Sequence, residues 1–129
     1  MPDEVALELS RQWVQKAAED LEAARQLQGL PTTRAFHCQQ AVAKGKALLV
    51  LCDVDFTKTH DIDVLLRQLD SMGLNPEGVE TSDLAALTRF AVDTRYPPES
   101  ASDDAAGEAL SIAEDFHRWT EATIASHGA

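Results

Sequence analysis

The residues best suited to chemistry in this chain are a small set of cations, histidines and one tyrosine. Lysine and arginine neutralise phosphate oxygens, arginine with two parallel hydrogen bonds, and tyrosine can stack on a base. The candidates for binding a nucleotide or another anion are His37, Lys44, Lys46, His60, Arg89, Arg95 and Tyr96. Lys44 and Lys46 fall on different sides of one expected helix, so we do not expect one site to use both from a single subunit.

Several of these candidates also have a purely structural interpretation. His60 follows a loop and is compatible with a histidine that is hydrogen-bonded to a neighbouring segment. Arg95 lies near the acids Asp93 and Asp61 in the expected fold, so a salt bridge competes with phosphate binding. Tyr96 could instead pack its ring in the core with its hydroxyl hydrogen-bonded. At this point both interpretations stay open.

No catalytic or metal-binding pattern accompanies these residues. Cys38 and Cys52 lie fourteen positions apart on one expected helix, about 21 Å along its axis, so they cannot share a metal ion. Cys38 is expected to be a small buried core residue. A glycine-rich phosphate loop is missing as well. The sequence therefore predicts no metal site.

The charge balance is strongly acidic. The chain has 129 residues, with 11 Lys and Arg against 22 Asp and Glu, and a formal net charge of −11. Broad, charge-driven binding to nucleic acid needs a cationic surface, so it is not expected here. Residues 34–60 are nevertheless locally basic, with Arg34, Lys44, Lys46 and Lys58 against Asp53 and Asp55. This segment is either ordinary surface variation or a local site for an anion or an acidic partner.

Length and composition predict one globular domain over residues 1–129. Hydrophobic residues make up 44% of the chain, a share that is ordinary for a protein with a buried core. The longest apolar run, residues 47–52, is far too short to cross a membrane. The acidic start resembles neither a signal peptide nor a transit peptide. We therefore expect a cytoplasmic protein without structural disulfides.

Helix signals dominate the chain, and no stretch alternates long enough to predict a strand. Apolar residues recur at spacings of three and four, and Gly, Pro, Ser, Thr and Asp mark the expected ends. The expected helices run from about 3 to 28, from Thr32 or Thr33 to about Cys52, from a cap at Thr59 or Asp61 to Gly73, from about Thr81 to Pro97, and from about 100–103 to Ser126. Short connections favour antiparallel neighbours. The expected fold class is all-α, an up-and-down antiparallel bundle of about five helices.

The second of these helices is apolar on two opposite sides. Such a helix either sits in the middle of the bundle or packs its smaller second face across a dimer axis. In the second case the residues expected at the dimer face are Phe36, Gln40, Ala43, Ala47 and Val50.

The same helix carries a family resemblance. The run from Phe36 to Leu49, Phe-His-Cys-Gln-Gln-Ala-Val-Ala-Lys-Gly-Lys-Ala-Leu-Leu, resembles the signature helix of the HEPN domain family (higher eukaryotes and prokaryotes nucleotide-binding). Further matches, in the family's order, are Trp13 with Asp20-Leu21, Thr59-His60-Asp61-Ile62 and Arg95-Tyr96-Pro97. Two positions depart, because Ala43 stands where Glu is common and Gly45 where a larger helix former is usual. The resemblance implies a compact helical bundle, usually a homodimer, and many prokaryotic members act with a minimal nucleotidyltransferase.

Some members of the family are metal-independent ribonuclease toxins of toxin–antitoxin pairs. Those nucleases carry an Arg followed four to six residues later by a His. Neither Arg89 nor Arg95 is followed by a His at that spacing, and the other Arg–His pairs in the chain are spaced too closely or too widely. Metal-free cleavage needs a group that takes the 2′-hydroxyl proton and a cation at the phosphate. We therefore expect no ribonuclease activity of this type and assign no catalytic residue.

The first hypothesis for function is a non-catalytic HEPN module. It would form a homodimer, act with a minimal nucleotidyltransferase, and take a nucleotide such as ATP as its candidate ligand. The alternatives are a metal-independent ribonuclease toxin with a displaced active site, and a structural interaction bundle that binds no nucleotide. Tyr96 is the only tyrosine, so it would be the sole acceptor if the partner transferred AMP to a tyrosine.

Overall fold

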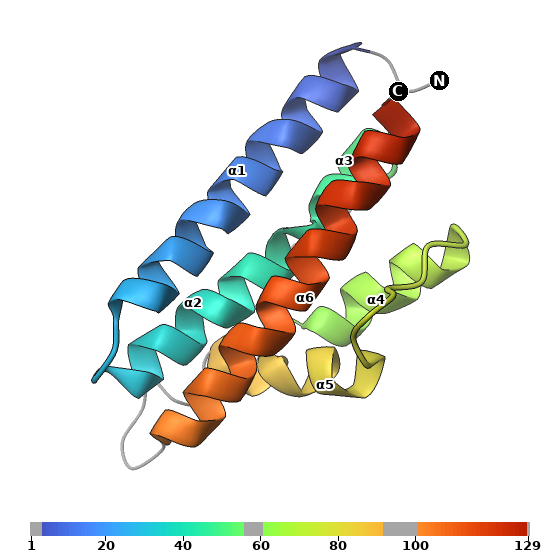
Figure 1. Cartoon of the computed structure of the whole chain (residues 1–129). Coiled ribbons are helices and arrows are strands. Elements are labelled where there is room, and N and C mark those ends of the chain that lie inside the picture. Colours follow the sequence, from blue (N-terminus) through green and yellow to red (C-terminus); the bar gives the residue numbers. More distant parts are fainter. Residues whose placement is uncertain (1–3, 56–60, 92–100, 129) are drawn as a thin grey trace.

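The structure is a computed structural model that describes residues 4–55, 61–91 and 101–128, and within these ranges the regular elements are all helical (Figure 1). The elements in chain order are α1 (Glu4–Gln26), α2 (Pro31–Ala43), the 3₁₀-helix η1 (Lys44–Lys46), α3 (Ala47–Leu51), α4 (Ile62–Ser71), α5 (Thr81–Ala86), the 3₁₀-helix η2 (Leu87–Ala91) and α6 (Asp103–Gly128). If α2, η1 and α3 are taken as one bent helix and α5 with η2 as another, the five expected helices are all present. The expectation of an all-α bundle is confirmed.

Three long segments form the body of the bundle. Helix α1, the bent helix α2–η1–α3 and helix α6 lie side by side, and α1 begins at the end of the molecule where α6 ends (Figure 1). Helix α4 packs on α2 and α3, while α5 and η2 run across this group and contact α2, α4 and α6. Helix α1 therefore runs antiparallel to both α2–η1–α3 and α6, as the up-and-down order predicts, but α2 and α6 start at the same end of the bundle and run in the same direction (Figure 1). The shorter helices close one side.

The predicted apolar stripes form one continuous core. Leu21 of α1, Leu49 of α3, Leu69 of α4, Leu84 of α5 and Phe116 of α6 are all fully or almost fully buried in it. Side chains from every α-helix therefore meet in a single cluster, as the helical spacing of apolar residues predicted.

The turn between α1 and α2 differs from the expectation in its capping. Gly29 adopts a positive φ of 88°, a backbone conformation that glycine reaches without strain, and Pro31 occupies the first position of α2, where its missing N–H costs nothing. The prediction of a threonine cap was wrong, because the residue before the helix is Leu30 and makes no side-chain cap. The Thr32 hydroxyl instead accepts a hydrogen bond from the backbone N–H of Ala101, 3.1 Å away, and so fastens the start of α6 to α2.

The second helix is interrupted rather than continuous. One turn of 3₁₀-helix at Lys44–Lys46 separates α2 from α3, and Gly45 lies at its centre. A Cβ on Gly45 would lie 2.5 Å from Cε2 of Phe116, so the ring occupies the space that a side chain would need. The departure from the family pattern at Gly45 therefore has a packing reason, which is the close approach of Phe116.

The starts of α4 and α6 are explained by local capping. Asp61 caps α4 by accepting a hydrogen bond from the N–H of Asp63 at 3.0 Å, as one of the two predicted caps, and Ser102 accepts one from the N–H of Ala105 at the start of α6. Such side-chain caps satisfy backbone donors that the first turn leaves unpaired. The predicted stop at Pro97–Pro98 and the alternative cap Thr59 lie outside the described residues.

Candidate functional site

A cluster of opposite charges joins α1 to α2 and η1. Asp20 on α1 receives two partners, because its Oδ1 lies 2.9 Å from Nδ1 of His37 and its Oδ2 pairs with Nζ of Lys44. A carboxylate only accepts hydrogen bonds, so the proton of this His37 contact lies on Nδ1, and Nε2 is the nitrogen directed away from Asp20. The three side chains are partly buried, with 14% of Asp20 and 19% of Lys44 exposed.

The second lysine of the signature helix has a different partner. Nζ of Lys46 lies 4.2 Å from the ring centroid of Trp13, a cation–π distance. Trp13 and Asp20 are seven residues apart on α1, so they lie on the same side of that helix, about 10 Å apart along its axis. The structure thus brings His37, Lys44 and Lys46 to one side of α1, with each lysine held by its own residue.

This arrangement changes the interpretation of the locally basic segment. Arg34, at its start, donates from Nε to the carbonyl of Ala24 at 2.9 Å and so satisfies the C-terminal end of α1. Lys44 is paired with Asp20 and Lys46 with Trp13. The described cations of this segment therefore fix the signature helix to α1, and an anion that binds there has to compete with Asp20.

The other predicted anion-binding residues do not join the cluster. Arg89 is exposed on η2, where its guanidinium lies 4.6 Å from the ring centroid of Phe90. His60, Arg95 and Tyr96 lie outside the described residues.

Asp20 and Trp13, which organise the cluster, were missing from the predicted site. The spacing of seven on one helix face was the signal that could have found them.

Four of the five residues expected at a dimer face are half-buried, namely Phe36, Gln40, Ala43 and Val50. The fifth, Ala47, is 0% exposed and belongs to the core, so its assignment to that face was wrong. A 3₁₀-helix turns about 120° per residue instead of 100°, so three residues at η1 rotate the following segment by about 60°. This extra rotation carries Ala47 inward.

Three exposed apolar side chains, two on α1 and one in the segment after α3, lie near this half-buried face. Val5 is 70% exposed, Leu9 45% and Val54 38%. Because Lys46 sits over Trp13, the residues that follow Lys46 run along α1 toward its N-terminal end, where Val5 and Leu9 lie. We call Val5, Leu9, Ala43, Val50 and Val54 the apolar strip. Its α1 members were not predicted from sequence, because exposed apolar residues near a helix end carry no periodic signal of their own.

The cysteines are consistent with the structural interpretation. Cys38 is buried, and burial raises the pKa of its thiol to about 12, so it stays a neutral core residue. Cys52 is exposed, and both cysteines are free thiols. Within residues 4–55, 61–91 and 101–128, no group of three His, Cys, Asp or Glu side chains is placed to hold a metal ion.

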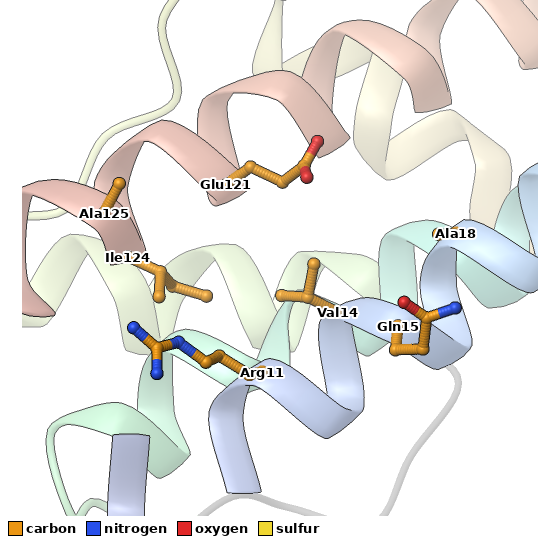
Figure 2. Close-up of a pocket in the computed structure, with 7 residues that line it drawn as sticks. All are labelled: Arg11, Val14, Gln15, Ala18, Glu121, Ile124 and Ala125. Carbon is orange, nitrogen blue, oxygen red and sulfur yellow. The ribbon is translucent and has the colours of Figure 1, made fainter. Parts of the chain in front are cut away.

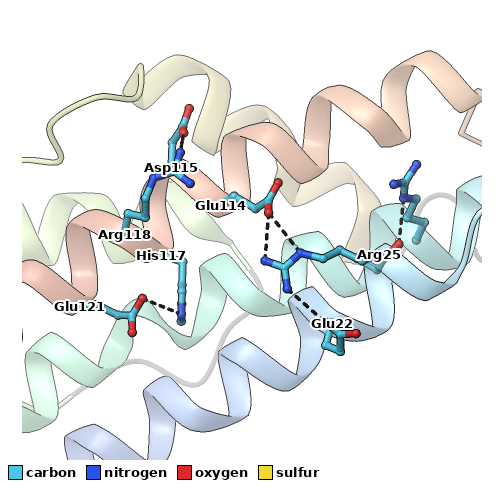
Figure 3. Close-up of polar contacts among 9 residues, drawn as sticks. Glu22, Arg25, Glu114, Asp115, His117, Arg118 and Glu121 are labelled. Carbon is cyan, nitrogen blue, oxygen red and sulfur yellow. Dashed lines mark hydrogen bonds and ion pairs between the residues drawn. The ribbon is translucent and has the colours of Figure 1, made fainter.

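A ladder of polar contacts lines the seam between α1 and α6 (Figure 3). Arg25 of α1 reaches across to Glu114 of α6 at 2.9 Å and also pairs with Glu22. One turn further along α6, Nε2 of His117 lies 3.2 Å from Oε1 of Glu121. Burial lowers the pKa of His117, against the opposing effect of Glu121, so the neutral form of the ring is favoured over the charged one.

The same seam opens into a cavity at its other end, lined by residues of α1 and α6 (Figure 2). None of the predicted anion-binding residues that the structure describes lines this cavity. The cluster around Asp20 and the cavity are therefore separate features on different sides of α1.

Comparisons with known proteins agree with the fold and the signature residues. The model of the HEPN domain matches residues 10–123, which is most of the chain and includes Trp13, the Asp20 cluster and the whole of the signature helix. No curated protein and no solved structure matches the chain significantly. No helix among the described residues is both long enough and apolar enough to span a membrane. The family match, with the all-helical bundle and the cluster that fixes its second helix, shows that the chain belongs to the HEPN domain family.

Proposed function

We propose that the chain is a non-catalytic HEPN module that pairs with a second copy of itself and acts with a minimal nucleotidyltransferase. The observation that carries the proposal is the apolar strip, of which a single copy of the chain leaves Val5, Leu9 and Val54 exposed and the other two members half-buried. Burying exposed valine and leucine side chains stabilises an interface by about 25 cal/mol per Å² of apolar area. A second copy offers the same strip to itself across a two-fold axis.

The non-catalytic part of the proposal is supported by the state of the described cations. His37 is oriented by Asp20 and lies beside Lys44, whose charge Asp20 already balances. Arg89 stacks on Phe90 and is followed by no histidine at the family's nuclease spacing. A metal-free ribonuclease needs an arginine and a histidine directed at the same phosphate. RNA cleavage by the pure chain would therefore contradict this part and favour the toxin alternative.

Light scattering on the purified chain tests the pairing. At micromolar concentration we expect the mass of a dimer, and Leu9→Glu or Val50→Glu should shift it to a monomer because each places a charge in the apolar strip. Leu30→Glu is the matched control, since Leu30 is also exposed but lies in the turn before α2. Each copy carries a formal charge of −11, so two copies repel each other. Higher salt screens this repulsion and should therefore strengthen the dimer. A strict monomer would contradict the pairing.

Light scattering on the chain co-expressed with a minimal nucleotidyltransferase tests whether the two proteins form a complex. We expect the two proteins to elute together with a mass larger than that of the dimer. If the chain elutes separately from the nucleotidyltransferase, the proposal that the two proteins form a complex is contradicted. Mass spectrometry of the co-expressed chain then shows whether Tyr96, which lies outside the described residues, gains an AMP group.

Nucleotide binding is a second candidate function, and the seam where Trp13 of α1 faces α2 and η1 favours it. His37 and Lys44 meet Asp20, which lies about two helical turns along α1 from the indole of Trp13, a spacing suited to a phosphate and a base. A phosphate would compete with Asp20 for Lys44, and a base would compete with Lys46 for the indole face. Calorimetry with ATP and with GTP should show binding that His37→Gln weakens by about tenfold. His127→Gln, at the exposed end of α6, should leave it unchanged. No heat with either nucleotide would favour the structural interaction bundle.

A further inference from the structure

The cavity between α1 and α6 has the composition of a small ligand site. It has a volume of about 250 Å³, and Val14 and Ala18 of α1 with Ile124 and Ala125 of α6 supply its apolar lining. At 100° per residue, Arg11, Gln15 and Ala18 of this lining lie on the opposite side of α1 from Trp13 and Asp20. The cavity is thus independent of the Asp20 cluster.

The polar group at the rim is an arginine that lacks a counter-ion. Arg25, four turns further along α1, reaches Glu114 of α6, whereas α6 presents Ile124 and Ala125 to the cavity beside Arg11. Among the residues that the structure describes, no carboxylate, carbonyl or aromatic ring pairs with Arg11, and none accepts or donates a hydrogen bond to the amide of Gln15. Arg11 and Gln15 are therefore available to a ligand.

The lining contains one carboxylate, that of Glu121. Its Oε1 lies 3.2 Å from Nε2 of His117 on the same helix, so its nearest described partner is on α6 and not on α1. In Figure 2, Glu121 projects from the α6 wall and Arg11 from the α1 wall, with Val14 and Ile124 between them. The positive and negative groups are thus separated by apolar surface, and the charge at the Arg11 end of the cavity is unbalanced.

We propose that this cavity binds a small amphiphilic carboxylate, whose acid group pairs with Arg11 and Gln15 and whose apolar body packs on Val14, Ala18 and Ile124. A planar carboxylate matches the two parallel N–H groups of a guanidinium. A single negative charge also meets less repulsion from Glu121, and from a protein of net charge −11, than a phosphate dianion would. A cavity of about 150 Å³ holds benzene, so this one has room for a ring or a short chain together with its acid group.

Titration of the isotope-labelled full chain with octanoate, followed by amide NMR shifts, tests the proposal. We expect saturable shifts that are largest for the amides of the α1 and α6 residues around the cavity. Octanamide has the same apolar body without the charge, and acetate has the charge without the body. Both should bind about tenfold more weakly or not at all, because each lacks one half of the recognition.

Two variants separate this site from general adsorption of an amphiphile. Arg11→Gln should weaken octanoate binding about tenfold, and Ala125→Phe should block it by filling the mouth of the cavity; both positions are exposed, so the fold should persist. Arg118→Gln is the matched control, because Arg118 is an exposed arginine of α6 that pairs with Asp115. Shifts that do not saturate, that octanamide reproduces, or that survive Arg11→Gln unchanged would overturn the proposal.

Discussion

Replacing Gly45 by alanine should destabilise the protein by about 2 kcal/mol, although alanine is the better helix former. The added Cβ would lie 2.5 Å from Cε2 and 2.7 Å from Cζ of Phe116, well inside van der Waals contact. Phe116 is 1% exposed in the core, so its ring cannot swing into solvent. Overpacking of this kind typically costs about 1–3 kcal/mol. The gain from replacing glycine within a helix is about 1 kcal/mol and offsets only part of that cost.

Urea unfolding followed by circular dichroism measures this difference, and the chain supplies its own control. Gly107 lies inside α6, and a Cβ there would meet no atom within 4 Å. Gly107→Ala should therefore stabilise the protein by about 0.5–1 kcal/mol, the opposite sign from Gly45→Ala. The double variant Gly45→Ala with Phe116→Leu should be less destabilised than the sum of the two single variants, because the smaller side chain makes room for the new methyl group. Equal shifts of the urea midpoint for Gly45→Ala and Gly107→Ala would contradict the packing argument.

The close contact of Gly45 with Phe116 also shows where the sequence stops predicting the fold. The helices and their buried stripes follow from the spacing of apolar residues, which is local information. Gly45 and Phe116 are 71 residues apart in the sequence (116 − 45), and nothing near either residue indicates that they meet. The interruption of the second helix at η1 has Gly45 at its centre and comes with the inward position of Ala47; the spacing of apolar residues indicates neither.

For the candidate site, as for the fold, the sequence predicted the local features but not the contacts between distant residues. His37, Lys44 and Lys46 were identified by residue type on a helix that matches the family. Residue type alone could not show that Lys44 is neutralised by Asp20, because a partner on another helix is set by how the two helices pack. The cavity beside Arg11 could not be predicted from the sequence for the same reason, because its two walls come from opposite ends of the chain.

Replacing Asp20 by alanine should cost about 2 kcal/mol of folding free energy, because it removes the acceptor shared by His37 and Lys44. Breaking a fully buried ion pair costs about 3–5 kcal/mol, and breaking an exposed one costs about 1 kcal/mol or less. Asp20 is 14% exposed and Lys44 19%, so this pair lies between the two limits. Without Asp20, Lys44 of η1 loses its contact with α1. The ion pair therefore helps to hold the signature helix in place against α1.

A double-mutant cycle on urea unfolding distinguishes this role from a general effect of removing a surface acid. Asp115→Ala is the matched control, because Asp115 also pairs with a cation, Arg118, but the pair is 39% and 69% exposed on α6; its loss should change stability by less than about 0.5 kcal/mol. Adding Lys44→Met to Asp20→Ala should restore part of the lost stability, because it removes the charge that Asp20→Ala leaves without a counter-ion. If Asp20→Ala costs no more than Asp115→Ala, or if Lys44→Met restores nothing, then solvent already screens Asp20 and Lys44. The signature helix would in that case be held to α1 by its apolar contacts alone, and Lys44 would be available to bind an anion.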